Sequence, residues 1–469
     1  MNWKTLLRSF KSRDMRNRVL AVLGLVAVYR FLAHVPVPLA EPTQLKDAMK
    51  QVITQGSYGG FLNLLSGGAL TSISIMLVGL NPYITASVIM QLLTKAIPSL
   101  DEMSQDGESG RRKINQWTRI ITLPLAVLQS VAYIFILRSN ILTSTPVVGD
   151  MDPMHWAVSI SAMAGGAILV MWLGEIMTEQ GIGNGITLII MVGILSQIPN
   201  NIGAIIGAVR TPNGNPFHLF NWFTIESLNN TATWLAIGLV IAMIIMLYLL
   251  VKLNEGQRIV QIDYAKRVHG NSQYGGVKSI IPIKLISAGV IPVIFAVAFL
   301  SIPAFIGQIL RATGANEELG SQLMLIFQRN YSASGIVTGW QAAIYPVCYV
   351  ALIIMFTYFY TSIVFNSKEI ADNLQKQGGF IEGIRPGKQT EKYLHNVVNR
   401  LTLFGSIALG IISVMPFIGE YIFVAAGQSS MASSLSLGGT GLLIIVTGAL
   451  ECIRSLNSRA LMTTYDEFK

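Results

Sequence analysis

The sequence predicts an all-α polytopic membrane protein, in which ten transmembrane helices form two pseudo-symmetric, inverted halves of five with both chain ends in the cytoplasm. Three observations lead to this fold class. Hydrophobic residues make up 52% of the chain and charged residues only 12%, whereas soluble globular proteins carry about 25% charged residues. Ten apolar stretches approach the roughly 20 residues that cross a bilayer as a helix. The Lys and Arg residues fall mainly on one side if these stretches alternate in direction.

The first span follows a basic N-terminal segment, residues 1–18. The apolar stretch behind it is too long for the core of a secretory signal peptide and has no small-residue cleavage site. We therefore expect a permanent helix there. The ten expected spans are 19–37, 72–95, 118–137, 156–177, 184–208, 232–251, 283–302, 342–366, 402–418 and 437–456.

The distribution of basic residues predicts the orientation of the chain. With the N-terminus inside, the segments that face the cytoplasm hold most of the 33 Lys and Arg residues, including those of the tail 457–469. An odd number of spans would place basic loops on both sides. The formal net charge of +9 is therefore mostly a topology signal, although large basic loops can also attract anionic lipids.

The external loop 209–231 divides the chain into an N-terminal half, 19–208, and a C-terminal half, 232–456. Five spans in each half give the halves opposite orientations, which is the arrangement of inverted repeats around a central pathway. The C-terminal half also carries two long cytoplasmic loops, 252–282 and 367–400. Their length predicts a role beyond connection.

A short apolar segment precedes the second span. Residues 61–65 are too few to cross a membrane, and glycine pairs flank them at 59–60 and 67–68. Such a segment at membrane depth must be shielded by protein or line a cavity, which predicts a movable re-entrant segment at about 61–75. An interfacial loop before a kinked helix explains the residues equally well. We also expect Pro82 to interrupt the second span.

Two pairs of β-branched residues are spaced by one helical turn. Ile84 and Val88 lie in the second span, and Ile186 and Ile190 lie in the fifth. Each pair shares one helix face. From the residues alone, such pairs are core or lipid contacts in most membrane helices. The sequence GIGNG at 181–185, just before the fifth span, predicts a tight turn, because no strand precedes it as a dinucleotide fingerprint requires.

The charged segment 365–401 separates two apolar spans. A glycine pair at 378–379 and the sequence RPG at 385–387 predict a shaped tip that presents an arginine.

Nothing in the chain indicates an enzyme. Cys348 and Cys452 both lie in apolar spans and predict packing residues rather than a disulfide or a metal site. No phosphate-binding loop and no nucleophile–base constellation occur, so we expect no catalytic residue, no metal and no cofactor.

Several motifs together resemble the SecY family, the pore-forming subunits of the bacterial Sec protein translocase. They are NLLSGGAL, MWLGEIMTEQGIGNGI, EGQRIVQIDYAKR and the segment 365–401, and the resemblance runs from about residue 15 to 460. It implies a passive channel in the plasma (inner) membrane of a bacterium. Unfolded secretory chains would pass through its centre, and transmembrane segments would leave sideways between spans two and seven.

The resemblance also implies roles for individual residues. The plug that closes the resting pore would consist of Phe61, Leu62, Asn63, Leu64, Leu65, Ser66, Gly67 and Gly68. The hydrophobic pore ring would consist of Ile84, Val88, Ile186, Ile190, Ile294 and Ile444. The surface that receives the motor ATPase SecA or the ribosome would include Arg258, Lys266, Arg267, Arg385, Pro386, Gly387 and Lys388.

The chain departs from the family pattern at two positions. Ile259 follows Arg258 where the family usually has a second arginine. Ile286 stands where the family commonly has an asparagine at the lateral gate, near the glutamine that corresponds to Gln91. Isoleucine cannot hydrogen-bond to Gln91, which predicts a gate sealed more by packing than by polar contacts.

The implied partners are SecE, SecG, SecA, the ribosome, signal peptides and nascent secretory or membrane proteins, with anionic lipids as a further possibility. A secondary transporter with inverted repeats is the main alternative. The scarcity of carboxylates inside the expected spans and the two large basic loops argue against it. A polytopic transferase would need a polar catalytic cluster, which the sequence does not show.

Overall fold

The computed structural model describes residues 13–37, 74–141, 153–210, 216–219, 223–264, 267–269, 272–274, 278–286, 289, 291–313, 316–327, 341–425 and 429–466. The chain forms two compact units, each assembled from separate segments. The first unit contains Met1–Ala242, Val297–Tyr345 and Pro416–Lys469. The second contains Met243–Ala296 and Pro346–Met415. The two five-span halves expected from the sequence stay a prediction.

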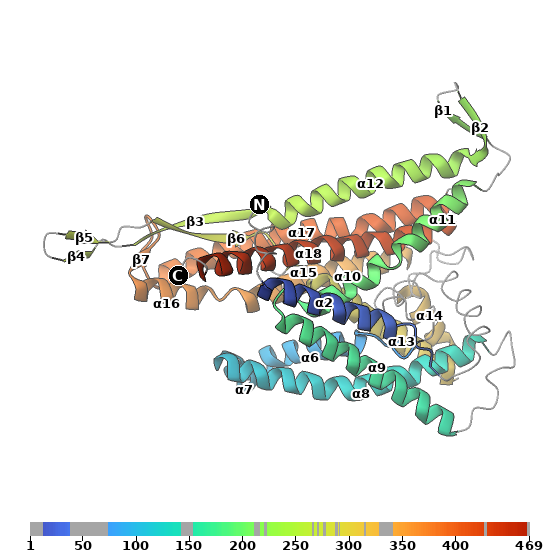
Figure 1. Cartoon of the computed structure of the whole chain (residues 1–469), viewed down its shortest axis with the longest axis horizontal. Coiled ribbons are helices and arrows are strands. Elements are labelled where there is room, and N and C mark those ends of the chain that lie inside the picture. Colours follow the sequence, from blue (N-terminus) through green and yellow to red (C-terminus); the bar gives the residue numbers. More distant parts are fainter. Residues whose placement is uncertain are drawn as a thin grey trace. The chain divides into compact units, whose positions relative to one another are not determined.

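The first unit is built mainly of helices (Figure 1). They are α2 (Arg13–Leu32), α6 (Asn81–Ala96), α7 (Pro98–Gln105), α8 (Gly107–Ile141), α9 (Pro153–Glu179), α10 (Gly185–Leu195), α11 (Ile198–Arg210), α14 (Glu317–Phe327) and α18 (Ser429–Asp466). Helix α9 packs against α8 and α10 and also contacts α2 and α6. It is therefore a central helix of this unit.

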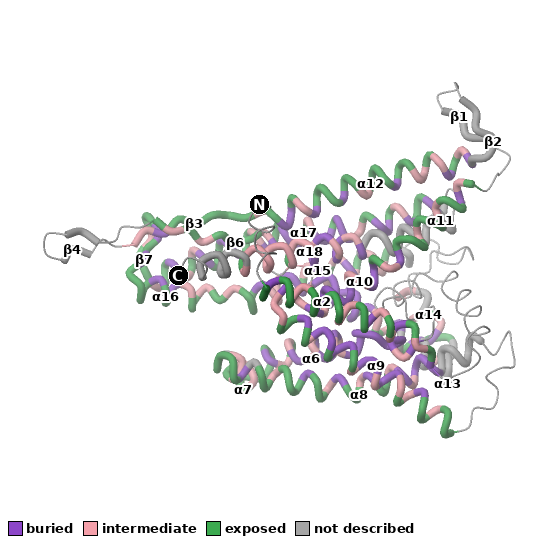
Figure 2. Tube along the Cα trace, viewed as in Figure 1, coloured by how far each residue is buried: buried purple, intermediate pink, exposed green. Residues whose placement is uncertain are grey.

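Four long helices run from one unit into the other. They are α12 (Asn230–Glu255), α13 (Ile291–Thr313), α15 (Gln341–Val364) and α17 (Lys388–Ala425). Helix α12 is exposed along much of its length (Figure 2). Its exposed side chains include Ile241 and Ile244, and an exposed apolar surface of this kind suits contact with lipid.

Seven helical stretches in the described residues are long and apolar enough to cross a membrane, which supports a polytopic membrane protein. They are Gly107–Ile134, Pro153–Glu179, Gly185–Arg210, Asn230–Glu255, Ala343–Gln377, Lys388–Phe423 and Gly441–Arg459. A shorter apolar helix covers Ile291–Ala304. Helices overlap every one of the predicted spans, but ten crossings stay a prediction.

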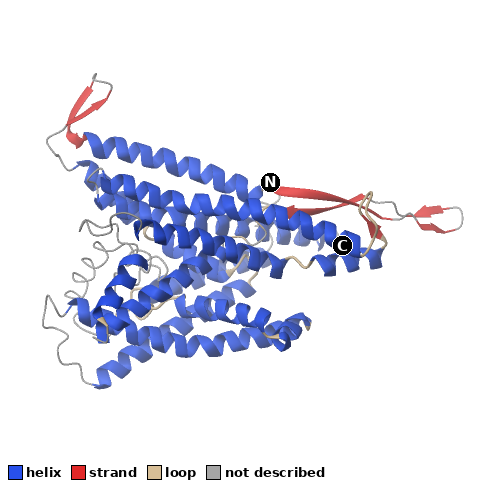
Figure 3. Ribbon diagram, turned by 180° about the vertical axis from the view of Figure 1, so that it is seen from behind, coloured by secondary structure: helices blue, strands red, loops and turns tan. Residues whose placement is uncertain are grey.

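The described chain is mostly helical, as expected, but short strands that the sequence analysis did not predict occupy connections between helices (Figure 3). Strands β1 (Pro216–Leu219) and β2 (Phe223–Asn229) form one hairpin, and β4 (Arg267–His269) and β5 (Ser272–Tyr274) form another. A three-stranded antiparallel sheet has the order β6 (Lys278–Lys284), β3 (Gln257–Tyr264), β7 (Gly379–Phe380). In β3, buried Val260 and Ile262 alternate with exposed residues, as expected of a strand with one covered face.

The start of α6 also differs from the expected second span. The helix begins at Asn81 with Pro82 in its first turn, so Pro82 starts the helix instead of interrupting it. Proline suits this position because its missing N–H would have no helical partner there. Residues 74–80 are not helical, and all of them except Ile75 are buried. The Ile75 N–H donates to the Val35 carbonyl oxygen at 3.0 Å.

Candidate pore ring and cytoplasmic docking surface

Helix α6 carries the first pair of candidate ring residues. Ile84 and Val88 are one helical turn apart and are 3% and 6% exposed, so both side chains are buried. The hydroxyl of Thr85 donates to the Asn81 carbonyl oxygen at 2.9 Å. The pair therefore occupies a buried face within the first two turns of the helix.

Helix α10 carries the second pair directly after the predicted glycine turn. Ile190 is 1% exposed and Ile186 is half-buried. The side-chain oxygen of Asn184 accepts hydrogen bonds from the N–H groups of Ile186 and Thr187, at 3.0 and 3.5 Å. This N-cap satisfies amides that lack helical partners. It therefore fixes where α10 begins and, with it, the position of Ile186 along the helix axis.

Glycines in the turn 181–185 are required by close packing. Gly181 has a φ of +68°, a conformation that glycine adopts readily. A Cβ at Gly185 would collide with the carbonyl oxygen of Gly174 in α9. The N–H of Gly185 also donates to the Thr178 hydroxyl at 2.8 Å. The expected tight turn is confirmed, and it joins α9 and α10 with little room for side chains.

The other two candidate ring residues lie on separate helices. Ile444 in α18 is 3% exposed and belongs to the first unit. Ile294 in the first turn of α13 is 9% exposed and belongs to the second unit. The structure therefore brings all the candidate ring residues except Ile294 into one compact unit.

The candidate plug residues Phe61, Leu62, Asn63, Leu64, Leu65, Ser66, Gly67 and Gly68 lie outside the described residues. The described chain resumes at Ser74, which pairs with Pro36 in an isolated β-bridge.

The two candidate gate residues lie in different units. In the first unit, Gln91 donates from its side-chain nitrogen to the Ser87 hydroxyl at 3.0 Å, and its buried side-chain oxygen has no hydrogen-bond partner among the described residues. In the second unit, Ile286 is 6% exposed. A Cβ at Gly405 in α17 would lie 3.6 Å from the Cγ1 atom of Ile286, so Ile286 packs closely against that helix.

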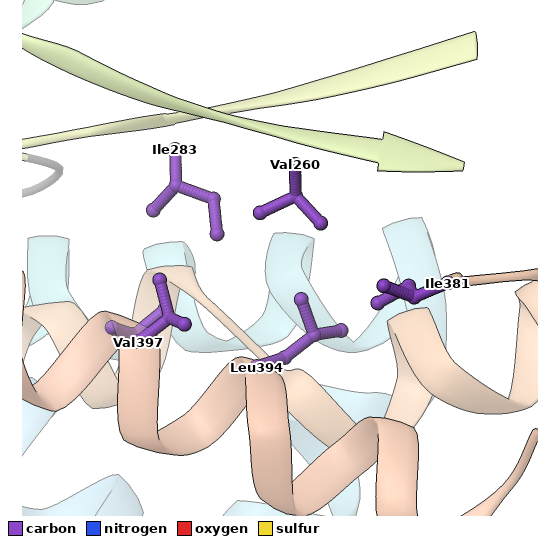
Figure 4. Packing of buried hydrophobic residues seen from close by; sticks show 6 residues of the cluster. Val260, Ile283, Ile381, Leu394 and Val397 are labelled. Atoms are coloured by element: carbon purple, nitrogen blue, oxygen red, sulfur yellow. The ribbon is translucent and has the colours of Figure 1, made fainter. Parts of the chain in front are cut away.

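The two long cytoplasmic loops expected from the sequence fold together within the second unit. Val260 and Ile283, from β3 and β6, pack with Ile381, which follows β7, and with Leu394 and Val397 of α17 (Figure 4). Val398 completes this cluster, and Leu394 is 0% exposed. We call these six residues the loop core. It gives the two loops a common support and makes them one folded surface.

The tip of the second loop is held by backbone hydrogen bonds. The hydroxyl of Thr390, itself 2% exposed, donates to the Arg385 carbonyl oxygen at 3.0 Å. The Glu391 N–H donates to the Gly387 carbonyl oxygen at 3.1 Å, and Gly387 has a φ of +94°. The expected shaped tip is present, and the Arg385 side chain is exposed on it.

Three of the six remaining candidate docking residues are exposed on the same unit. Arg258, Pro386 and Lys388 are exposed, and Gly387 is half-buried. Arg267 begins β4, whereas Lys266 lies outside the described residues. Ile259, which replaces the second arginine of the family, is 52% exposed on β3.

Sequence reasoning missed one buried carboxylate. We expected the ninth span to end at residue 418, but α17 continues to Ala425. Glu420 therefore lies within an apolar helix and is only 2% exposed. The sequence signal for this burial is that Glu420 follows shortly after the apolar run and is itself followed by aromatic residues.

Comparison with known proteins identifies the group to which this arrangement belongs. The sequence profile of SecY matches residues 74–453. The chain belongs to the SecY family. It is 35% identical over 467 residues to the protein translocase subunit SecY of Streptomyces scabiei, which covers 98% of each chain.

Solved structures agree on the fold of this SecY-family chain. One similar structure is of a SecY protein whose plug domain stabilises the closed state of the translocation channel. It has a TM-score of 0.60 at 19% identity, and the match covers 93% of this chain and 91% of that one. Sec61 in the canine ribosome–channel complex has a TM-score of 0.57 at 19% identity, with coverages of 92% and 91%. At this identity, the likeness is one of fold.

Proposed function

We propose that this chain is the protein-conducting subunit of a bacterial translocase, which passes unfolded secretory polypeptides across the membrane and releases transmembrane segments into it. It is a channel subunit and not an enzyme. The observation that carries this proposal is its relation to SecY over nearly the whole length of both chains. The buried aliphatic positions on α6, α10 and α18 are consistent with it.

The proposed ring seals the resting channel by its apolar character. It comprises Ile84, Val88, Ile186, Ile190, Ile294 and Ile444. β-Branched side chains have few rotamers, and a narrow apolar constriction excludes water and ions by dewetting. Such a ring makes no polar contact specific to one passing side chain, which suits a conduit for many sequences. Residues 61–68 form the plug that adds a second seal.

The proposed topology has ten spans with both ends in the cytoplasm of a bacterium and the plasma membrane as its location. Spans one to five, with the plug at about 61–75, form the N-terminal half 19–208, and spans six to ten form the C-terminal half 232–456. The external loop 209–231 is the hinge, and the lateral gate lies between spans two and seven, near Gln91 and Ile286. The distribution of Lys and Arg residues supports this orientation.

The proposed docking surface is the folded pair of cytoplasmic loops above the loop core. Arg258, Arg385 and Lys388 are exposed on it, and a basic surface attracts an acidic protein face or ribosomal RNA. SecA and the ribosome are the proposed partners there, and a similar solved structure is a ribosome–channel complex. SecE and SecG are the proposed small membrane partners, and anionic lipids can bind the same basic side.

A photo-crosslinking experiment tests the channel directly. The crosslinker is placed at Ile186 in the full translocase, and a secretory precursor is stalled midway through export. We expect adducts to the mature part of the precursor. The matched control is Ile176 of α9, which is 42% exposed and should not crosslink to the precursor. Absence of adducts at Ile186, together with efficient labelling by small solutes, would favour a secondary transporter instead.

A further inference from the structure

Helices α10 and α18 approach each other closely at glycines. A Cβ added to buried Gly448 of α18 would lie 3.0 Å from the Cγ2 atom of Thr187 and 3.7 Å from the sulfur of Met191. Near the start of α10, a Cβ at Gly183 would lie 3.1 Å from the Sγ atom of Cys452. We call these facing positions the α10–α18 seam. Thr187 is 5% exposed, so the seam has little free space.

The seam places two candidate ring residues, Ile444 and Ile190, at nearly the same level along the helix axes. Gly183 faces Cys452, and residues 187–191 face Gly448, so the two helices run antiparallel. Ile444 precedes Gly448 by one turn and therefore lies one turn further along α10, at about the level of Ile190. Both isoleucines are buried, at 3% and 1% exposure.

We propose that Gly448 is a positioning residue that keeps α18 close enough to α10 for Ile444 and Ile190 to close the pore ring. This inference rests on the proposed function. A Cβ at position 448 would meet the Cγ2 atom of Thr187 at 3.0 Å, so Thr187 or its helix would have to shift by a few tenths of an ångström. Since a dewetted constriction depends on its narrow diameter, a small separation next to the ring should admit water and ions.

The test measures ion leak through the resting channel. The purified translocase containing the full chain is placed in proteoliposomes, and chloride efflux is recorded without a precursor. We expect Gly448→Ala to raise the leak about tenfold, which corresponds to a shift of about 1.4 kcal/mol in the closed–open equilibrium. Overpacking a filled interior commonly has effects of this size.

A second substitution separates this role from general helix packing. Thr187→Ser removes the Cγ2 atom that a Cβ at position 448 would meet, while it keeps the hydroxyl. The double variant Gly448→Ala, Thr187→Ser should therefore seal as well as the unmodified channel, and Thr187→Ser alone should not leak. The matched control is Gly165→Ala in α9, where an added Cβ meets nothing within 4 Å.

A third variant covers the case in which Gly448→Ala does not assemble. Thr187→Leu adds bulk to the same contact from α10 and should also leak. Full sealing by assembled Gly448→Ala or Thr187→Leu, or a leak that Thr187→Ser does not reverse, would overturn the inference. If precursor adducts still form at Ile186 in those complexes, the channel function stands and only the role of the seam fails.

Discussion

Replacement of Leu394 by alanine tests whether the two long loops, 252–282 and 367–400, share one folded surface. Leu394 of α17 is 0% exposed and packs with Val260, Ile283 and Ile381 of the loop core. Loss of a fully buried leucine side chain removes its transfer free energy and leaves a cavity, with a typical cost of about 3 kcal/mol. A hairpin without a covered face is only marginally stable in water. The β3–β6 hairpin should therefore open more often when its support on α17 is weakened.

Hydrogen exchange measures this opening. A loss of about 3 kcal/mol should speed exchange of the most protected β3 and β6 amides roughly hundredfold, with the complex held in lipid nanodiscs. The control is Leu403→Ala, the same chemical change on the same helix at a side chain that is 53% exposed; it should leave these amides unchanged. Unaltered protection of β3 and β6 in Leu394→Ala would refute the idea that the loop core supports the docking surface.

Three further substitutions test other parts of the arrangement. Arg385→Glu should block SecA-driven export while the channel still inserts into the membrane, because the exposed tip keeps its hydrogen bond from Thr390 to the Arg385 carbonyl oxygen. Export assays compare this variant with Lys376→Glu in α16, and normal export by Arg385→Glu would contradict the prediction. Ile286→Asn should reduce export of precursors with defective signal sequences roughly fivefold, because an amide that restores a polar contact at the gate stabilises the closed gate by about 1 kcal/mol. Unchanged dependence of export on the signal sequence would count against a gate sealed by packing. Gly166→Ala should lower the free energy of unfolding by roughly 1–3 kcal/mol, because its Cβ would collide with the Ile75 carbonyl oxygen. The control Gly165→Ala should leave the melting temperature of the complex unchanged. Equal melting temperatures for the two variants would show that residues 74–80 can move aside to accommodate the added methyl group.

Hydropathy predicted where the helices lie, because a helix satisfies its own backbone wherever the surroundings are apolar. It did not predict the start of α6. Residues 74–80 are as apolar as a span, but their N–H groups bond outside a helix: the Ile75 N–H donates to the Val35 carbonyl oxygen, and the Met76 N–H donates to the Ser74 hydroxyl. Hydropathy cannot distinguish these two ways of burying a backbone. Gly79, with a φ of +58°, and Pro82 were the local signals of a helix start.

The strands were missed for a different reason. In the segment 252–282, the Lys and Arg residues predict a basic loop, although buried Val260 and Ile262 alternate with Ile259 and Gln261 on the other face. The partner that covers this face is α17, far along the sequence. Sequence patterns can show that a strand has one apolar face, but they do not show what covers it. The shaped tip at 385–387 was predictable because its glycine and proline act locally.

The buried carboxylate of Glu420 changes how the channel and carrier hypotheses should be weighed. The expected spans contain few acidic residues, which speaks against a proton-coupled carrier, but only if the ninth span ends at residue 418. The helix runs through Pro416 to Ala425, and Glu420 is 2% exposed. Whether a carboxylate near a span end is buried depends on distant helices that pack around it, which no local window contains. The distinction between channel and carrier therefore rests on the relation to SecY along the whole chain, and not on the number of acidic residues counted within predicted boundaries.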